Sequence, residues 1–136
     1  MKFVDTSWWV AITLPNDSRH GDASGMIHHI GSSERILTTN LVLGESWTLL
    51  RRRDVHPVAV DFMDRIEKLR LNGTLTVHRV TPEQEARAWN WLRLHDERNY
   101  SFVDATSFQV MRDRRMREAL AFDQDFAAAG FIELRP

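Results

Sequence analysis

The sequence predicts an α/β domain in which a central, mostly parallel β-sheet is flanked by helices. Short apolar runs alternate with longer amphipathic stretches along the whole chain, which is the pattern of repeated strand–helix units. With 43% apolar residues, five Trp and seven Phe, the chain can fill a sizeable hydrophobic core. Its 136 residues are the usual length of one domain, so we expect a single domain over residues 1–136.

The strands are expected at five short apolar runs. These runs occupy residues 2–4, 36–38, 75–80, 119–122 and 131–134. Strands that alternate with helices form parallel sheets with right-handed crossovers, and such sheets bind ligands at the carboxyl ends of their strands. Polar residues that directly follow a strand are therefore the first candidates for a functional site.

The helices are expected where amphipathic stretches begin at a capping residue or proline and end at glycine, asparagine or proline. These stretches occupy residues 7–14, 21–30, 40–53, 58–71, 81–95, 101–115 and, as a single turn, 123–128. The strongest start signals are Thr39 or Asn40, Thr81 and Ser101. Residues 31–33, with the sequence Gly-Ser-Ser, are expected to form a turn.

Several functional classes are excluded by what the sequence lacks. The absence of cysteine removes disulfide scaffolds, Cys-ligated zinc and thiol nucleophiles, and the six histidines form no zinc-binding pair. A serine nucleophile elbow and a glycine-rich phosphate loop are also absent. The apolar runs are shorter than the roughly 18 residues of a membrane span. Asp5 interrupts any secretory signal, so we expect a cytoplasmic protein without a membrane segment.

Two acidic residues directly follow predicted strands. Asp5 comes after Phe3-Val4, and Asp123 comes after the run that ends at Phe122. Because parallel strands end at the same edge of a sheet, both carboxylates are expected at that edge. Each has a structural alternative, since Asp between a strand and a helix is a favoured N-cap.

Two further acids lie on predicted helices beside apolar neighbours. Glu45 is one turn from Leu41 and from Leu49, so its carboxylate should be at least partly buried. The alternative is a Glu at the margin of the apolar face, or one paired with an arginine at the end of that helix. Asp104 is the third residue after Ser101, where it either belongs to a capping box or contributes to a site.

Four carboxylates at one edge of a sheet would repel one another strongly unless divalent cations neutralised them. Ligation by oxygen alone favours Mg²⁺ or Mn²⁺ over zinc. The chemistry that such a cluster serves is metal-assisted hydrolysis of a phosphodiester.

Four segments of the chain resemble the acidic motifs of PIN-domain nucleases. These segments are Phe3–Ser7, Thr38–Glu45, Ser101–Phe108 and Ala121–Phe126. Their order and spacing and the total length are most similar to the toxins of VapBC toxin-antitoxin pairs. The resemblance implies a PIN-like three-layer sandwich with a central sheet of four to five strands, and a Mg²⁺- or Mn²⁺-dependent endoribonuclease.

The same resemblance implies roles for individual residues. Asp5, Glu45, Asp104 and Asp123 are the expected catalytic metal ligands, and Ser107, Asp125 and Thr6 are the residues beside them that could assist. Phe122 departs from the family pattern, because many relatives have Thr or Ser before the fourth acid. The implied partners are a structured RNA, such as a tRNA or rRNA stem-loop, a VapB-like antitoxin and a second copy of the chain in a homodimer.

Other functions that use similar residues fit less well. A phospho-acceptor domain needs a Lys at the end of a strand, and neither Lys2 nor Lys68 is so placed. A phosphatase with an Asp nucleophile would have a second Asp two residues after Asp5, where Ser7 stands. The main alternative is a PIN-like module that binds RNA or protein without catalysis.

Arginines supply nearly all the positive charge, since all but two of the 18 basic residues are Arg. Arg51, Arg52 and Arg53 either complement the dipole of the helix that they end or contact RNA phosphates beside the acids. The run from Arg112 to Arg117 is either a solvated face or a second phosphate contact.

The five tryptophans are expected to divide between core and surface. Trp8 and Trp9 point about 100° apart on one helix, so we expect one of them to face a partner such as the antitoxin. Trp47, Trp89 and Trp91 are expected in the core rather than as stacking platforms for bases.

Overall fold

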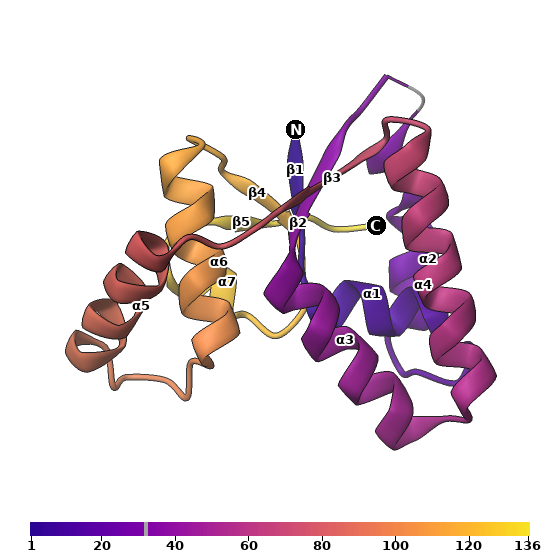
Figure 1. Ribbon diagram of the computed structural model, residues 1–136, viewed down its shortest axis with the longest axis horizontal. Coiled ribbons are helices and arrows are strands. Elements are labelled where there is room, and N and C mark those ends of the chain that lie inside the picture. Colours follow the sequence, from indigo (N-terminus) through magenta and orange to yellow (C-terminus); the bar gives the residue numbers. More distant parts are fainter. Residues whose placement is uncertain (32) are drawn as a thin grey trace.

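The computed structural model describes residues 1–31 and 33–136 and contains a five-stranded sheet in the order β3-β2-β1-β4-β5. Every neighbouring pair of strands is parallel (Figure 1). The strands are β1 (Lys2–Val4), β2 (Ile36–Thr39), β3 (Leu75–His78), β4 (Glu118–Leu120) and β5 (Ile132–Glu133). All five carboxyl ends therefore lie at one edge of the sheet.

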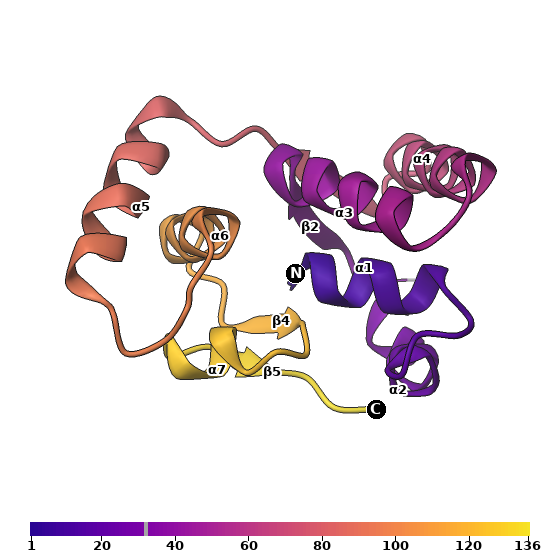
Figure 2. The ribbon, with the colours of Figure 1, turned by 90° about the horizontal axis from the view of Figure 1, so that it is seen from below.

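Helices cover the sheet on both sides. They are α1 (Thr6–Thr13), α2 (His20–Gly25), the 3₁₀ turn η1 (Ile27–Ile30), α3 (Asn40–Arg53), α4 (His56–Leu71), α5 (Pro82–Leu94), α6 (Phe102–Asp113) and α7 (Asp125–Ala128). Helices α1 to α4 gather on one side and α5 to α7 on the other, with the strands between them (Figures 1 and 2). This arrangement confirms the predicted sandwich of a parallel sheet between helices.

The central strand β1 is fully buried at Phe3 and Val4. Phe3 of β1 pairs in register with Leu37 of β2 and with Ala119 of β4, and all three side chains are fully buried. A strand buried on both faces is expected to read as a continuous apolar run rather than an alternating one. The short runs in the sequence were therefore sufficient to place the middle of the sheet.

The helix starts follow the capping signals. The Thr39 hydroxyl accepts a hydrogen bond from Val42 N (3.1 Å), and Thr81 forms a capping box with Gln84. Ser101 forms the corresponding box with Asp104. Each cap satisfies backbone N–H groups that have no partner within the helix, which explains why the predicted starts were accurate.

The predicted ends of the elements were less accurate. The stretch 21–30 is not one helix but two pieces, α2 and η1, which meet at the fully buried Met26. Two glycines and a serine in α2 are weak helix formers, so little in this stretch favours a longer helix. Position 32 of the predicted 31–33 turn lies outside the described residues.

Three strands are shorter than predicted, and at the ends of β3 and β4 nearby side chains take over the backbone hydrogen bonds. β3 ends at His78, and the N–H of Val80 donates to the Asn40 side chain (2.9 Å). β4 ends at Leu120, and the N–H of Phe122 donates to Ser7 Oγ (3.1 Å). At the edge of the sheet, β5 covers only two residues.

The prediction that Trp8 or Trp9 faces a partner was wrong, because both side chains are buried. Helix α1 is packed on more than one side, by α2, α3 and the sheet, so side chains about 100° apart both enter the core. The indole N–H of Trp9 donates to Thr38 Oγ1 (3.3 Å), and its ring packs edge-on against Phe62.

The prediction that Trp89 is in the core was also wrong. Its side chain is 51% exposed and stacks on Phe102 of α6 with ring centroids 4.1 Å apart. Trp47 and Trp91 are half-buried and pack against the core, as predicted. In the described residues, no helix combines the length and the apolar character needed to cross a membrane.

Candidate active site

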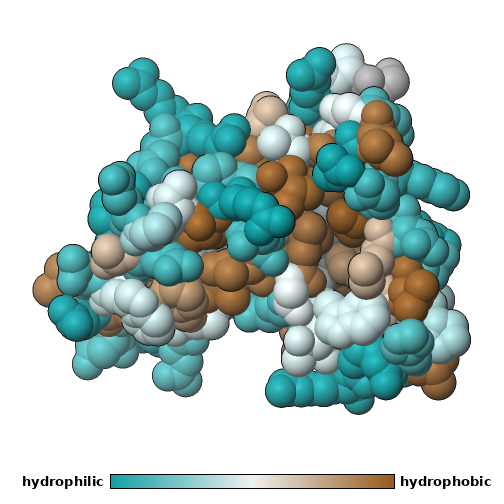
Figure 3. Space-filling model, in the orientation of Figure 1, coloured by the Kyte–Doolittle hydropathy of each residue, from teal (hydrophilic) through white to brown (hydrophobic). Residues whose placement is uncertain are grey.

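A cavity of about 510 Å³ opens at the carboxyl edge of the sheet and brings the four predicted acids together. Asp5 follows β1, Glu45 lies on α3, Asp104 lies in the first turn of α6, and Asp123 follows β4. Figure 2 looks onto this edge, where α1 and α3 face α6. The space-filling view is hollowed at its lower border between the two groups of helices (Figure 3).

Asp5 is the most buried of the four acids and is fixed by the start of α1. Its Oδ2 accepts hydrogen bonds from Ser7 N (3.2 Å) and Ser7 Oγ (2.7 Å). Ser7 Oγ in turn accepts a hydrogen bond from Phe122 N (3.1 Å), which ties the first acid to the segment that carries the fourth. The predicted N-cap is therefore present, and the same carboxylate also lines the cavity.

The second acid, Glu45, is half-buried beside Leu49, which also lines the cavity. This position confirms the prediction that apolar neighbours on α3 would partly bury the carboxylate. Thr6 of α1 lies on the same wall, and its hydroxyl donates to the carbonyl of Val42 (3.4 Å). Thr6 therefore holds α1 against α3 rather than presenting a free hydroxyl.

The third acid, Asp104, is part of the predicted capping box and also lies at the cavity. Its Oδ2 accepts a hydrogen bond from Ser101 N (3.0 Å), which closes the capping box, and its side chain also lines the cavity. Ser107, one turn further along α6, is fully buried and is not among the residues that line the cavity. Within the described chain its Oγ has no hydrogen-bond partner.

The fourth acid, Asp123, does not cap a helix. Helix α7 begins after Gln124, a residue with φ of +66° that makes no side-chain cap bond. Asp123 is the most exposed of the four acids, and it shares the cavity wall with Asp125. The position of this carboxylate therefore depends on the turn that carries it rather than on a regular element.

Burial and mutual repulsion hold three of these carboxyl groups at raised pKa values. Burial, opposed by the Ser7 hydrogen bonds and reinforced by the charge of Asp104, raises the pKa of Asp5 to about 7. Burial raises the pKa of Asp104 to about 6, with further contributions from the charges of Asp125 and Glu45. The pKa of Asp123 is raised by burial and by Asp125. Full ionisation of the cavity therefore costs free energy that a cation would relieve.

The donor set fits a hard divalent cation, since the cavity presents carboxylate and hydroxyl oxygens and neither sulfur nor imidazole. In residues 1–31 and 33–136, no three acidic or histidine side chains come close enough to form a ready-made metal-binding group. The acids are thus spread over the walls of an open cavity. To bind one ion together, these acidic side chains would have to move closer to one another.

Comparison with known proteins decides the family. The family model of the PIN domain matches residues 2–132. The chain belongs to the PIN-domain family.

The relatives of this PIN domain are similar to it over its whole length. The 23S rRNA-specific endonuclease VapC20 of Mycobacterium tuberculosis is 49% identical over 136 residues, which are 100% of this chain and 99% of the relative. The same identity holds for VapC20 of a second strain. The crystal structure of M. tuberculosis VapC20, described as a sarcin-ricin loop cleaving toxin, has a TM-score of 0.89 at 48% identity and full coverage of both chains. These findings confirm the predicted PIN-like fold and the resemblance to VapBC toxins.

The predicted arginines of this PIN domain fall into different surroundings. Arg53 lines the cavity and forms an ion pair with Asp17 (2.6 Å), and Arg52 lines an adjoining groove between α3 and α6. Arg51 donates to the carbonyl of Asp54 (3.2 Å) at the end of α3. All three are exposed at the same helix end, where they are accessible to a ligand.

Arg112 does not belong with these residues. It lies near the other end of α6 from Asp104, with its guanidinium over the rings of Trp91 (5.9 Å) and Phe131 (5.7 Å). It does not line the cavity. Arg112 therefore lies away from the acids, and its contact with RNA phosphate stays a prediction.

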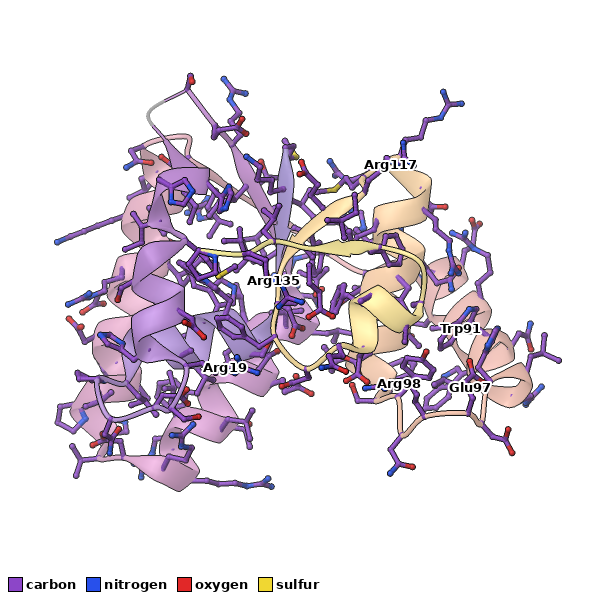
Figure 4. The ribbon with its side chains drawn as sticks, turned by 180° about the vertical axis from the view of Figure 1, so that it is seen from behind. Arg19, Trp91, Glu97, Arg98, Arg117 and Arg135 are labelled. Atoms are coloured by element: carbon purple, nitrogen blue, oxygen red, sulfur yellow. The ribbon has the colours of Figure 1, made fainter. Side chains whose placement is uncertain are left out.

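Sequence reasoning missed several polar residues of the cavity region, and three of them act on its acids. Ser7 bonds Asp5, and its Asp-x-Ser pattern was the one local signal available. Arg19 has its guanidinium over the Phe122 ring (5.3 Å) and lowers the pKa of Asp123, against the larger effect of burial. Arg98 bonds Asp125 (Figure 4). The last two lie outside helices and strands, in segments without a motif, so only the fold brings them to the acids.

Proposed function

We propose that this PIN domain is a Mg²⁺- or Mn²⁺-dependent endoribonuclease and the toxin of a type II toxin-antitoxin pair. The observation that carries the proposal is the single cavity lined by Asp5, Glu45, Asp104 and Asp123 in a chain 49% identical to an rRNA endonuclease. The alternative is a module that binds RNA or protein without catalysis. Retention of all four acids in one cavity favours the enzyme.

The four carboxylates are the residues that would hold the divalent ion. When bound, the ion supplies a Lewis acid for the phosphodiester and lowers the pKa of a water that attacks phosphorus. Ser7 keeps the Asp5 carboxylate directed into the cavity through two hydrogen bonds. Val10, Leu49 and Phe122 make the apolar part of the wall, which limits the water around the reacting phosphate.

For the substrate we propose a structured RNA, and within that class an rRNA stem-loop rather than a tRNA. VapC20 is described as specific for 23S rRNA and as cleaving the sarcin-ricin loop, and its identity with this chain covers the full length. The acids read no bases, so selectivity has to come from the surface around them. Arg51, Arg52 and Arg53 are the proposed phosphate contacts.

We also propose the partners and location that such a toxin requires. A VapB-like antitoxin would neutralise the enzyme, and a basic side chain of the antitoxin would complement the acidic cavity. A homodimer and a cytoplasmic location, where ribosomal RNA is accessible, complete the proposal. Expression of the chain alone should arrest growth, and coexpression of the antitoxin should restore it.

Titration with Mn²⁺ in the absence of RNA separates the nuclease from a binding module. We expect the wild-type protein to bind Mn²⁺ at pH 8, and Asp5→Asn and Asp104→Asn to weaken binding by at least about tenfold. Binding should also weaken as the pH falls from 8 to 5, because Asp5 and Asp104, with pKa values of about 7 and about 6, become protonated. Asp61→Asn on the exposed face of α4 is the matched control. Equal Mn²⁺ affinity in all four proteins would refute the proposed metal site.

A further inference from the structure

Arg98 contacts the turn that carries the fourth acid at two points. Its Nε and Nη2 both lie 3.0 Å from Asp125 Oδ1, and Nη2 donates to the backbone carbonyl of Asp123 (3.1 Å). Arg98 comes from the loop between α5 and α6, 27 residues before Asp125. Figure 4 shows its side chain directed toward the 123–125 turn.

The backbone of this turn needs support from outside. Gln124 has φ of +66°, a conformation that is uncommon for a residue with a side chain. On one side Glu133 accepts hydrogen bonds from Gln124 N (3.2 Å) and Ala127 N (3.0 Å). On the other side Arg98 holds the carbonyl and the carboxylate. Asp123 thus projects from a strained turn that is clamped by side chains on both sides.

The segment that carries Arg98 is itself anchored. Trp91 stacks on His95 (4.1 Å) and packs against Tyr100 (4.7 Å), which also contacts Phe108. Immediately after Tyr100, Ser101 caps α6 and bonds Asp104. Arg98 therefore connects a packed segment beside the third acid to the turn that bears the fourth.

Arg98 pairs with the acid whose charge acts on Asp104 and Asp123. Asp125 lies close enough to raise the pKa values of both Asp104 and Asp123. Arg98 bonds Asp125 directly and so offsets the charge of one of the six acidic residues that line the cavity. A carboxylate that is already paired with a guanidinium is also a poor additional ligand for a cation.

We propose that Arg98 is a positioning residue of the acidic cavity, which fixes the direction of Asp123 and keeps Asp125 paired outside the metal-binding set. This inference rests on the proposed nuclease function, because it assigns Asp123 to that chemistry. A lysine cannot replace the arginine, since one ammonium group does not reproduce the planar fork that reaches both the carbonyl and the carboxylate.

The alternative role for Arg98 is a direct phosphate contact with RNA. Loss of a phosphate contact raises KM and leaves kcat unchanged. It also lowers the slope of log binding constant against log salt concentration by about one. Loss of a positioning contact lowers kcat and weakens metal binding, with KM nearly unchanged. Outer residues that orient metal ligands typically change activity or metal affinity by about 10- to 100-fold.

The experiment compares Arg98→Gln, Arg98→Lys, Asp125→Asn and the Arg98→Gln/Asp125→Asn double variant. Arg117→Gln is the matched control, because Arg117 is exposed at the opposite edge of the sheet (Figure 4). Near-UV circular dichroism and urea unfolding establish that each variant is folded. Mn²⁺ affinity is measured by calorimetry without RNA, and kcat and KM are measured on an rRNA stem-loop at several salt concentrations.

We expect Arg98→Gln and Arg98→Lys to lower kcat and Mn²⁺ affinity by about 10- to 100-fold, and the control to match the wild type. Adding Asp125→Asn to Arg98→Gln should recover activity several-fold, because it removes the charge that Arg98 no longer offsets. A rise in KM with unchanged Mn²⁺ affinity, or unaltered kinetics in folded Arg98→Gln, would overturn the positioning role.

The Mn²⁺ titration and the RNA cleavage assay also distinguish this inference from the proposed function. If the wild type binds Mn²⁺ with the expected dependence on Arg98 but cuts no RNA, the nuclease proposal fails and the role of Arg98 stands. If RNA is cut and Mn²⁺ affinity does not depend on Arg98, the nuclease stands and the role of Arg98 fails.

Discussion

The first and fourth acids lie in the same cavity but are held in place by different means. Asp5 is buried at the junction of β1 and α1, where it caps the helix and accepts two hydrogen bonds from Ser7. Asp123 is exposed on a turn of unusual backbone conformation and depends on Arg98 for support. The comparison shows that regular secondary structure fixes one side of the site, whereas contacts between distant side chains fix the other.

The largest difference between the two acids should appear in the stability of the metal-free protein. The pKa of Asp5 is raised from 3.8 to about 7, so its neutral form is the one that the fold prefers. A raised carboxyl pKa means that stability is highest below the unfolded-state pKa and is lost as the pH rises through the folded-state pKa. At pH 8, Asp5→Asn should therefore increase the free energy of unfolding by on the order of 1–4 kcal/mol.

Urea unfolding in EDTA measures this effect. The gain from Asp5→Asn should be present at pH 8 and nearly absent at pH 4, and Asn retains an oxygen that can accept the Ser7 hydrogen bonds. Asp123→Asn, which changes the exposed acid, should give a smaller gain at pH 8. Equal gains from both variants would show that the two sides of the cavity do not differ in desolvation.

Removing the hydrogen bonds by which Ser7 links Asp5 to Phe122 should have an intermediate effect on stability. Ser7→Ala removes a donor to Asp5 and the acceptor of Phe122 N–H, so we expect a loss of about 1–2 kcal/mol in stability. Because the Ser7 bonds lower the pKa of Asp5, the variant should also need a higher pH to bind Mn²⁺. Differential scanning calorimetry and Mn²⁺ titration from pH 6 to 9 test both effects, with exposed Ser24→Ala on α2 as control. An unchanged pH dependence would mean that Ser7 does not tune the carboxylate.

The contrast between local secondary structure and long-range contacts also explains how much of the site could be predicted from the sequence. Asp5, Glu45 and Asp104 lie where strand ends, apolar helix faces and capping boxes are local patterns, so their convergence could be predicted. The Ser7–Phe122 bond spans 115 residues and the Arg98–Asp125 bond spans 27, and no local pattern encodes either. Such contacts depend on how loops from different parts of the chain approach each other.

The errors in the core have a similar origin. The approximately 100° separation of Trp8 and Trp9 predicts one buried ring only if a helix is covered on one side. Helix α1 is covered on several sides, and this follows from the arrangement of the layers rather than from the helix itself. The exposure of Trp89 likewise depends on the position of α5 at the outside of the molecule (Figure 2).

The smallest expected effect concerns the rim of the cavity. Changing Arg51, Arg52 and Arg53 together to Ala should raise KM for the RNA stem-loop and reduce the salt slope of binding, while Mn²⁺ affinity stays as in the wild type. The matched control changes Arg114, Arg115 and Arg117, which are exposed at the far end of α6 and beyond it. Equal changes in both triple variants would indicate a general effect of charge instead of contacts beside the cavity.

The central claim, that this cavity hydrolyses RNA, is tested most directly by single-turnover cleavage of a sarcin-ricin stem-loop of 23S rRNA. We predict that wild-type protein cuts the RNA with Mg²⁺ or Mn²⁺, stops in EDTA and resumes when metal is restored. Folded Asp104→Asn should be slower by at least about 100-fold, the upper end of what residues that only support a ligand contribute. Cleavage by Asp104→Asn at the wild-type rate under saturating metal would contradict the claim.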